Sequence, residues 1–211
     1  MSDAVDTSPT DEERRFLVAA AGHRGDAVTA RSGLDDIDPI VRSAALGALA
    51  RLDALSRSEI IDGLHDPSAI VRTRAVGVAI PHLDIDLRPL LTDPVPSVVE
   101  ATAFALGERD QDRGPVADLI DVAQQHPDEL CRESAVAALG ALGQAPGVDE
   151  EAIICCLLQA CEERAAIRRR AVIGLHQFED PRAEAAVRSA LTDPDRQTRG
   201  LAGDLLGEMV D

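Results

Sequence analysis

The sequence contains no tryptophan, no tyrosine and no lysine, and only three phenylalanines among its 211 residues. So few aromatic rings leave little that could stack on nucleic-acid bases. The core must be aliphatic, and apolar residues make up 45% of the chain. Alternating β-branched and polar runs between Asn-Gly or Asp-Gly turns are also missing, so we predict an all-α protein.

Basic charge is also scarce. All 21 basic residues are arginines, and they face 38 acidic residues, which gives a net charge of −17. A surface of this sign repels phosphate groups, so we expect no nucleic-acid partner and no membrane partner. Two explanations for the missing lysine stay open: GC-rich coding favours arginine codons, and a high-salt cytoplasm favours an acidic, lysine-poor surface. The acidic excess favours the second, halophilic interpretation, because coding bias does not produce it.

The charge imbalance makes a prediction about salt. We expect the fold to be markedly more stable in molar KCl than in millimolar salt, because the screening length falls from about 30 Å at 0.01 M to about 3 Å at 1 M. Thermal melts across this range measure the effect. Melts that coincide would contradict the salt-adapted interpretation.

Targeting signals are absent from the sequence. Residues 1–10 are polar and acidic, so we expect a flexible tail there and no signal peptide. Apolar runs such as Ile153–Leu158 are too short to span a bilayer. The cysteines cluster late in the chain and form no spaced disulfide framework: Cys131, Cys155, Cys156 and Cys161. We therefore expect a cytoplasmic protein.

Catalytic and metal-binding patterns are missing too. Cys155, Cys156 and Cys161 lack the Cys-x-x-Cys spacing that closes a tetrahedral zinc site. No Ser/His/Asp spacing, glycine-rich phosphate loop or carboxylate pair stands out. We therefore expect no metal, no cofactor and no enzymatic activity.

The positive signal is a repeat of about thirty residues. Asp-Pro turns are followed by Val-Arg or a similar pair, and small and aliphatic residues follow on one side of a helix. The arginine position of the successive repeats falls at Arg42, Arg72, Val99, Arg132, Arg168 and Arg199. Such a period is typical of a solenoid, in which each unit buries its apolar face against its neighbours.

We predict one domain over residues 11–211, a right-handed α-solenoid of about six helix pairs behind an N-terminal capping helix. That helix is expected over Asp11–Ala21, with a capping box formed by Thr10 and Glu13. Its apolar face should cover the open end of the stack: Phe16, Leu17 and Ala20.

The remaining helices follow from the repeat. The second helix of each pair should begin at an Asp-Pro turn, where the aspartate caps the helix. The first helices of the later pairs are expected at Ser56–Leu64, Ile85–Leu91, Pro115–Gln124, Glu150–Cys161 and Pro181–Leu191.

The Asp-Pro…Val-Arg…Ala…Ala-Leu-Gly pattern over residues 35–207 resembles the short HEAT-like repeats of the phycobilisome-lyase type. The resemblance implies HEAT-like helix pairs, and a family that holds scaffolds, lyase subunits and a few enzymes. The iron-dependent hydroxylases among them carry repeated His-Glu pairs. No histidine here is followed by glutamate, so we do not expect that enzyme class.

The resemblance also implies a structural ladder, in which an acidic turn residue meets an arginine of a neighbouring repeat. Asp66 and Arg72 are six residues apart, about 600° along a helix, so they do not share one helix face. Val99 takes the arginine position of the third repeat, and the ladder should break there. The predicted ladder residues are Asp36, Arg42, Asp66, Arg72, Arg132, Glu162, Arg168, Asp193 and Arg199.

The resemblance further implies that the side of the second helices opposite the buried stripe lines the concave surface. Small residues there surround a few large ones, a composition typical of interface anchors. The predicted protein-binding residues are Arg74, Phe104, Arg170, Ile173 and Leu201. In a second interpretation, Phe104 turns sideways and fills the gap left by the broken ladder.

Together these features predict a non-catalytic scaffold or adaptor that binds another protein on its concave face. The family resemblance implies a signalling or taxis system as an example of its setting. The alternative is a lyase-type accessory subunit that handles a chromophore or prosthetic group with a partner chain. We expect a monomer or a weak homodimer.

Overall fold

The structure is a computed structural model that describes residues 10–109, 115–143, 145 and 147–208. All regular secondary structure in these residues is helical, and the predicted all-α fold of paired helices is confirmed. None of the described helices is long and apolar enough to cross a membrane. Of the predicted tail, only Thr10 lies within the described residues.

The chain forms two compact units, Met1–Ala79 (unit 1) and Ile80–Asp211 (unit 2), and each is described by itself. The extent predicted for a single domain stays a prediction.

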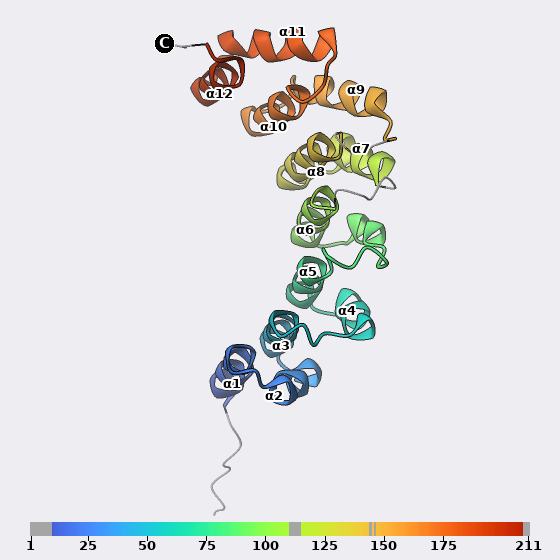
Figure 1. The fold of residues 1–211 in the computed structure, drawn as a ribbon, viewed down its shortest axis with the longest axis vertical. Coiled ribbons are helices and arrows are strands. Elements are labelled where there is room, and N and C mark those ends of the chain that lie inside the picture. The colour runs from blue at the N-terminus through green and yellow to red at the C-terminus, as the bar shows by residue number, and fades with distance from the viewer. Residues whose placement is uncertain (1–9, 110–114, 144, 146, 209–211) are drawn as a thin grey trace, which may run out of the picture. The chain divides into compact units, whose positions relative to one another are not determined.

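Unit 1 holds a capping helix and two helix pairs. The capping helix α1 and the second helices α3 and α5 form one layer, because α3 packs against both of the others. The first helices α2 and α4 lie on one side of that layer (Figure 1). The bounds are α1 (Asp11–Arg24), α2 (Ala27–Ser32), the 3-10 helix η1 (Gly33–Asp35), α3 (Pro39–Arg51), α4 (Arg57–Leu64) and α5 (Ala69–Val78).

Helix α1 begins where the sequence predicts. The Thr10 hydroxyl accepts the Glu13 N–H at 3.3 Å, and a Glu13 carboxylate oxygen accepts the Thr10 N–H at 2.7 Å. These two bonds complete the predicted capping box. They satisfy two backbone donors that have no partner within the helix.

The prediction that α1 covers the end of the stack with Phe16, Leu17 and Ala20 is wrong. Phe16 is 66% exposed and Leu17 is exposed too, whereas Val18, Ala21 and Gly22 are buried. The reason is close packing against α3, which needs the small residues of α1 and therefore turns its phenylalanine outward.

Unit 2 holds four helix pairs. Among its second helices, α8 packs against α6 and α10, and α10 packs against α12. The bounds are η2 (Arg88–Thr92), α6 (Pro96–Gly107), α7 (Val116–Gln125), α8 (Glu129–Leu142), α9 (Glu150–Ala160), α10 (Ala165–Leu175), α11 (Pro181–Ser189), η3 (Ala190–Thr192) and α12 (Arg196–Leu206). The predicted first helices match α4, α7, α9 and α11 to within two residues at each end.

The third pair departs from the prediction, because the short 3-10 helix η2 replaces the helix expected over Ile85–Leu91. Pro89 lacks an N–H and its ring clashes with the preceding turn, so an α-helix does not run through this segment. Ile85 is buried all the same. The Arg109 guanidinium, only 2% exposed, donates to the carbonyls of Ile85 at 2.8 Å and His82 at 3.1 Å. A buried arginine thus supplies hydrogen bonds that a helix would have supplied.

The expectation that the turn aspartates cap the second helices is wrong for Asp66 and Asp193. Each lies two residues before the helix N-cap, and its carboxylate accepts the N–H of that N-cap residue: Ser68 and Asp195, both at 2.7 Å. Side-chain bonds of this kind form Asx turns. The turns leave both carboxylates outside the helix end and facing the preceding repeat.

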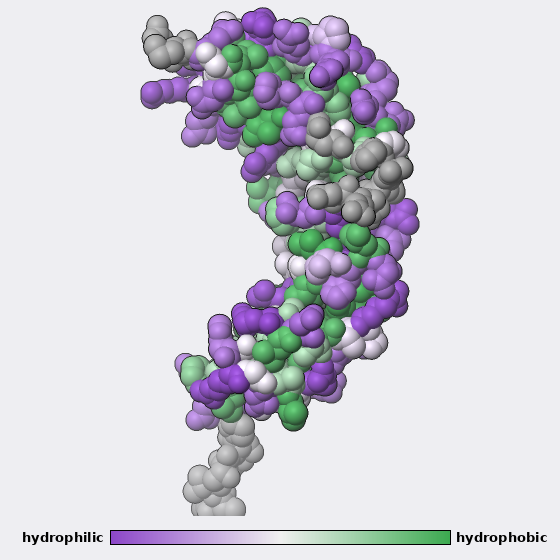
Figure 2. Space-filling view, in the orientation of Figure 1, coloured by the Kyte–Doolittle hydropathy of each residue, from purple (hydrophilic) through white to green (hydrophobic). Residues whose placement is uncertain are grey.

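In the view of Figure 2, hydrophilic side chains lie along the edges of each unit and hydrophobic side chains gather between them. Fully buried examples in unit 2 are Leu106, Leu139, Leu157 and Ile167. The core is therefore aliphatic, as the composition predicted, and the second helices can pack closely.

Candidate functional site

Arginines on the second helices pair with the turn aspartate of the following repeat. Arg42 Nε lies 2.7 Å from Asp66 Oδ2, and Arg168 Nε lies 2.6 Å from Asp193 Oδ2. In both pairs Nη2 donates to the second carboxylate oxygen, at 2.8 and 2.9 Å. Each contact is therefore bidentate, the strongest geometry for this pair of groups.

Other predicted ladder residues are placed differently. Asp36 pairs with Arg14 of α1 at 2.8 Å, although Arg14 was not among the predicted residues. Its position one repeat before Arg42 could have identified it. Arg132 pairs with Glu163 at 3.7 Å, while Glu162 is exposed.

Ladder arginines also hold the turn of their own repeat. Nη1 of Arg72 donates to the Asp66 carbonyl at 2.8 Å, and Nη1 of Arg199 donates to the Asp193 carbonyl at 2.7 Å. The arginine and the aspartate six residues before it are therefore in contact, through the arginine side chain and the aspartate backbone carbonyl. Val99 has no donor for this bond, and it is fully buried.

Contacts with arginine lower the pKa of two of the turn aspartates, Asp36 and Asp193. The hydrogen bond from Arg14 holds the pKa of Asp36 below its ordinary value of 3.8. Burial alone would raise the pKa of Asp193, but the hydrogen bonds from Arg168 and from the backbone outweigh it and leave that pKa lowered. The stability that comes from a lowered carboxylate pKa is fully present above about pH 3.8 and is lost as the pH falls through the folded-state pKa.

The cysteines are protonated thiols at neutral pH. Burial raises the pKa of Cys131, Cys156 and Cys161 to about 11, and the thiolate is the form that binds metals and attacks substrates. Within the described ranges, no group of three His, Cys, Asp or Glu side chains could hold a metal ion.

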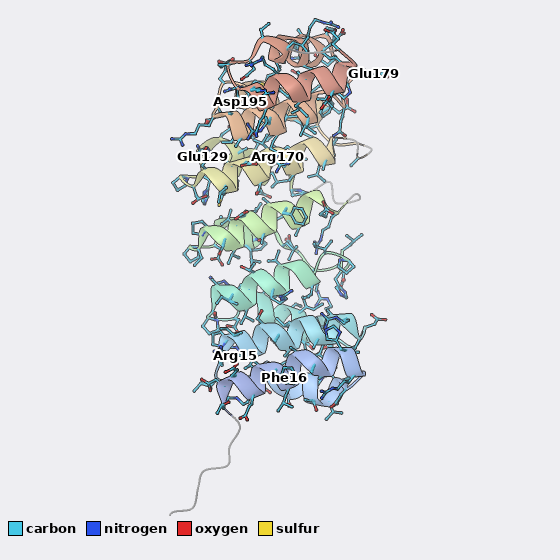
Figure 3. The ribbon with its side chains drawn as sticks, turned by 90° about the vertical axis from the view of Figure 1, so that its left-hand side faces the viewer. Arg15, Phe16, Glu129, Arg170, Glu179 and Asp195 are labelled. Carbon is cyan, nitrogen blue, oxygen red and sulfur yellow. The ribbon has the colours of Figure 1, made fainter. Side chains whose placement is uncertain are left out.

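The predicted protein-binding residues are divided between the units. Arg74 lies on α5 in unit 1, whereas Phe104, Arg170, Ile173 and Leu201 lie on α6, α10 and α12 in unit 2. We call the outward side of α6, α8, α10 and α12 the second-helix face of unit 2. Figure 3 looks onto this side and labels Arg170.

A pocket of about 280 Å³ on this face brings Phe104 and Arg170 together. Phe104 is 58% exposed, so most of its ring is accessible. Arg170 Nε donates to Glu133 Oε1 at 3.0 Å, which holds the guanidinium at the rim. Ile173 and Leu201 do not line the pocket. Its remaining lining is small or acidic: Gly107, Glu108, Glu133, Ser134, Ala137, Ala138 and Ala141.

Small residues also set the spacing of the helices that carry this pocket. A Cβ added at Gly107 would lie 2.8 Å from the Ala138 Cα, and one added at Gly140 would lie 2.9 Å from the Gly174 Cα. Real Cβ atoms essentially never come so close to another backbone. The helices pack closely at these points, and only small or acidic side chains line the pocket between Phe104 and Arg170.

No family model matches the chain, and no curated protein matches it. Solved structures do match. A designed armadillo repeat protein in complex with the peptide (KR)4 has a TM-score of 0.51 and 15% identity, with 95% of each chain covered. Human deoxyhypusine hydroxylase in complex with glycerol has a TM-score of 0.45 and 18% identity, covering 95% of this chain and 80% of that one.

The fold is that of a helical repeat protein and resembles armadillo repeats. Sequence identity this low shows the fold alone, and function must be argued from the faces of the two units.

Proposed function

We propose that this chain is a non-catalytic repeat scaffold that binds another protein on the second-helix face of unit 2. The observation that carries the proposal is the pocket between Phe104 and Arg170, in which an exposed aromatic ring and an arginine flank small residues. Aromatic and arginine side chains are the types that dominate binding energy at protein interfaces. The peptide complex of the designed armadillo repeat protein supports a peptide or protein as the ligand.

We further propose that the repeats are of the short HEAT-like, phycobilisome-lyase type, on the strength of the Asp-Pro…Val-Arg pattern. A cytoplasmic adaptor in a signalling or taxis system fits this assignment. No structural observation favours the accessory-subunit role in chromophore handling.

The test is the double substitution Phe104→Ala with Ile173→Ala. Partner binding should weaken by about thirtyfold or more, because truncating one hot-spot side chain costs about 2 kcal/mol. The melting temperature should barely change, since both side chains are exposed. The partner is identified by co-purification at native salt, and its affinity is then measured by titration calorimetry.

Leu83→Ala is the matched control. Leu83 is 52% exposed, a fraction similar to the 58% of Phe104, but it lies outside the second helices of unit 2. Its replacement should leave affinity unchanged. If the double variant instead melts early and binds normally per folded molecule, Phe104 and Ile173 are core residues and the proposal fails.

A further inference from the structure

Unit 1 carries a second exposed face with different chemistry. We call the side of α1, α3 and α5 that points away from the first helices the second-helix face of unit 1. Each of the three helices exposes one large apolar side chain there: Phe16, Ile40 and Ile70. Figure 3 labels Phe16 on α1. Because α3 packs against both α1 and α5, these side chains lie on adjacent helices.

Two arginines share this face. Arg74 follows Ile70 by about one helical turn, and Arg51 follows Ile40 by about three, so each lies on the same side of its helix as the isoleucine. Both arginines are exposed, and within the described part of the chain neither has a carboxylate partner. This sets them apart from Arg15, also in unit 1, which pairs with Asp38 at 2.6 Å.

Glycines of the neighbouring helix place both guanidinium groups. A Cβ added at Gly22 would lie 2.7 Å from Arg51 Nη1, and one added at Gly47 would lie 3.7 Å from Arg74 Nε. Arg51 thus reaches across α1, and Arg74 reaches across α3. Side chains that already rest on a surface lose less conformational freedom when a ligand binds.

We propose that this face binds an acidic segment of a partner protein. Carboxylates of that segment pair with Arg51 and Arg74, and its large apolar side chains contact Phe16, Ile40 and Ile70. Guanidinium groups match carboxylates in bidentate geometry, and these two have no such partner within the described residues. Two acidic residues near the start of α1, Glu12 and Glu13, lie four and three residues before Phe16 and share this side of the helix, and the Glu13 carboxylate is held by the Thr10 N–H.

The overall charge decides which anionic ligand fits. A nucleic acid needs a broad basic footprint, and a chain of net charge −17 with two such arginines does not offer one. A short peptide needs only local contacts, because repulsion from distant carboxylates is screened beyond about 8 Å at physiological salt. The proposal goes beyond the function proposed for unit 2, and the residues that test it lie in the other unit.

The probe is a short fluorescein-labelled peptide that alternates Glu-Asp pairs with Leu, titrated with the full chain at near-physiological ionic strength. Fluorescence anisotropy should show saturable binding. The same peptide with Gln and Asn in place of Glu and Asp should bind at least about tenfold more weakly, because it lacks the charges that pair with arginine. Arg51→Glu with Arg74→Glu should also weaken binding at least about tenfold, and Phe16→Ala should weaken it several-fold without changing the melting temperature.

Arg164→Glu with Arg196→Glu is the control, since it changes the net charge equally at two exposed arginines of unit 2. It should leave the affinity of the acidic peptide within about twofold. Equal loss in both double variants would mean non-specific attraction and would overturn the proposal, as would failure of the acidic peptide to bind.

Two other occupants give distinct results. A single-stranded oligonucleotide that binds more tightly than the peptide, and is lost with Arg51→Glu and Arg74→Glu, would make this a nucleic-acid face. A dimer in sedimentation that the same two substitutions dissociate would make the occupant a second copy. None of these results bears on Phe104, so the proposal for unit 2 stands or falls separately.

Discussion

Replacing Arg168 by alanine is expected to lower the free energy of unfolding by about 3 kcal/mol, the lower end of the range for breaking a buried ion pair. Both oxygens of Asp193 accept from Arg168, and the Asp193 side chain is only 7% exposed. Without Arg168, a nearly buried carboxylate keeps its charge without its partner. Urea unfolding at neutral pH measures the loss.

Arg170→Ala is the control on the same helix. Arg170 is also ion-paired, to Glu133, but its side chain is 51% exposed, and exposed pairs contribute about 0–1 kcal/mol. The loss at position 168 should shrink as the pH falls through the lowered pKa of Asp193, because protonation removes the charge that Arg168 stabilises. Equal losses at 168 and 170 would contradict the ladder as a source of stability.

Replacing Gly140 by alanine is expected to lower the free energy of unfolding by about 1–3 kcal/mol, the usual cost of overpacking. Helix propensity alone predicts the opposite, a gain of about 1 kcal/mol. Packing should prevail because the new Cβ would lie 2.9 Å from the Gly174 Cα, and backbone cannot rotate away as a side chain can.

Gly200→Ala separates the two effects. Gly200 lies inside α12, and nothing lies within 4 Å of a Cβ added there. That substitution should raise stability by about 0.5–1 kcal/mol, so the two glycines should respond with opposite signs. A gain at both positions, measured by the same unfolding experiment, would show that the helix crossing tolerates a methyl group.

Helix positions could be predicted from the sequence because their signals are local. The Thr10 and Glu13 side chains act within one turn, and the buried stripe repeats at the period of a single helix. The start of α9 at Glu150 and of α11 at Pro181 were likewise marked by residues next to them. Such signals do not depend on what the helix packs against.

What the sequence could not predict depends on neighbouring helices. Whether Asp66 caps its own helix or meets Arg42 is decided by the preceding repeat, which a capping rule does not consider. The burial of Arg109 depends on carbonyls of a segment that proline keeps from becoming an α-helix. Phe16 was assigned to the wrong side because the spacing of α1 and α3 was unknown.

The candidate faces show the same division. Phe104 and Arg170 were identified because their positions are outward on any helix with this buried stripe. Ile40 and Ile70 were not predicted, because the predicted binding residues all lie after the arginine position of their repeat. Both isoleucines stand two residues before it, on the same side of the helix.

The helix crossings have a consequence for how such a chain can change its length. Gly22 meets Ala48 in unit 1 at the same register at which Gly107 meets Ala138 and Gly140 meets Gly174 in unit 2. Junctions that share one shape are interchangeable, so a gene segment that encodes one repeat can be duplicated or deleted and the flanking repeats still fit. Proteins built this way can grow or shrink one repeat at a time, and their binding surface changes in equal steps.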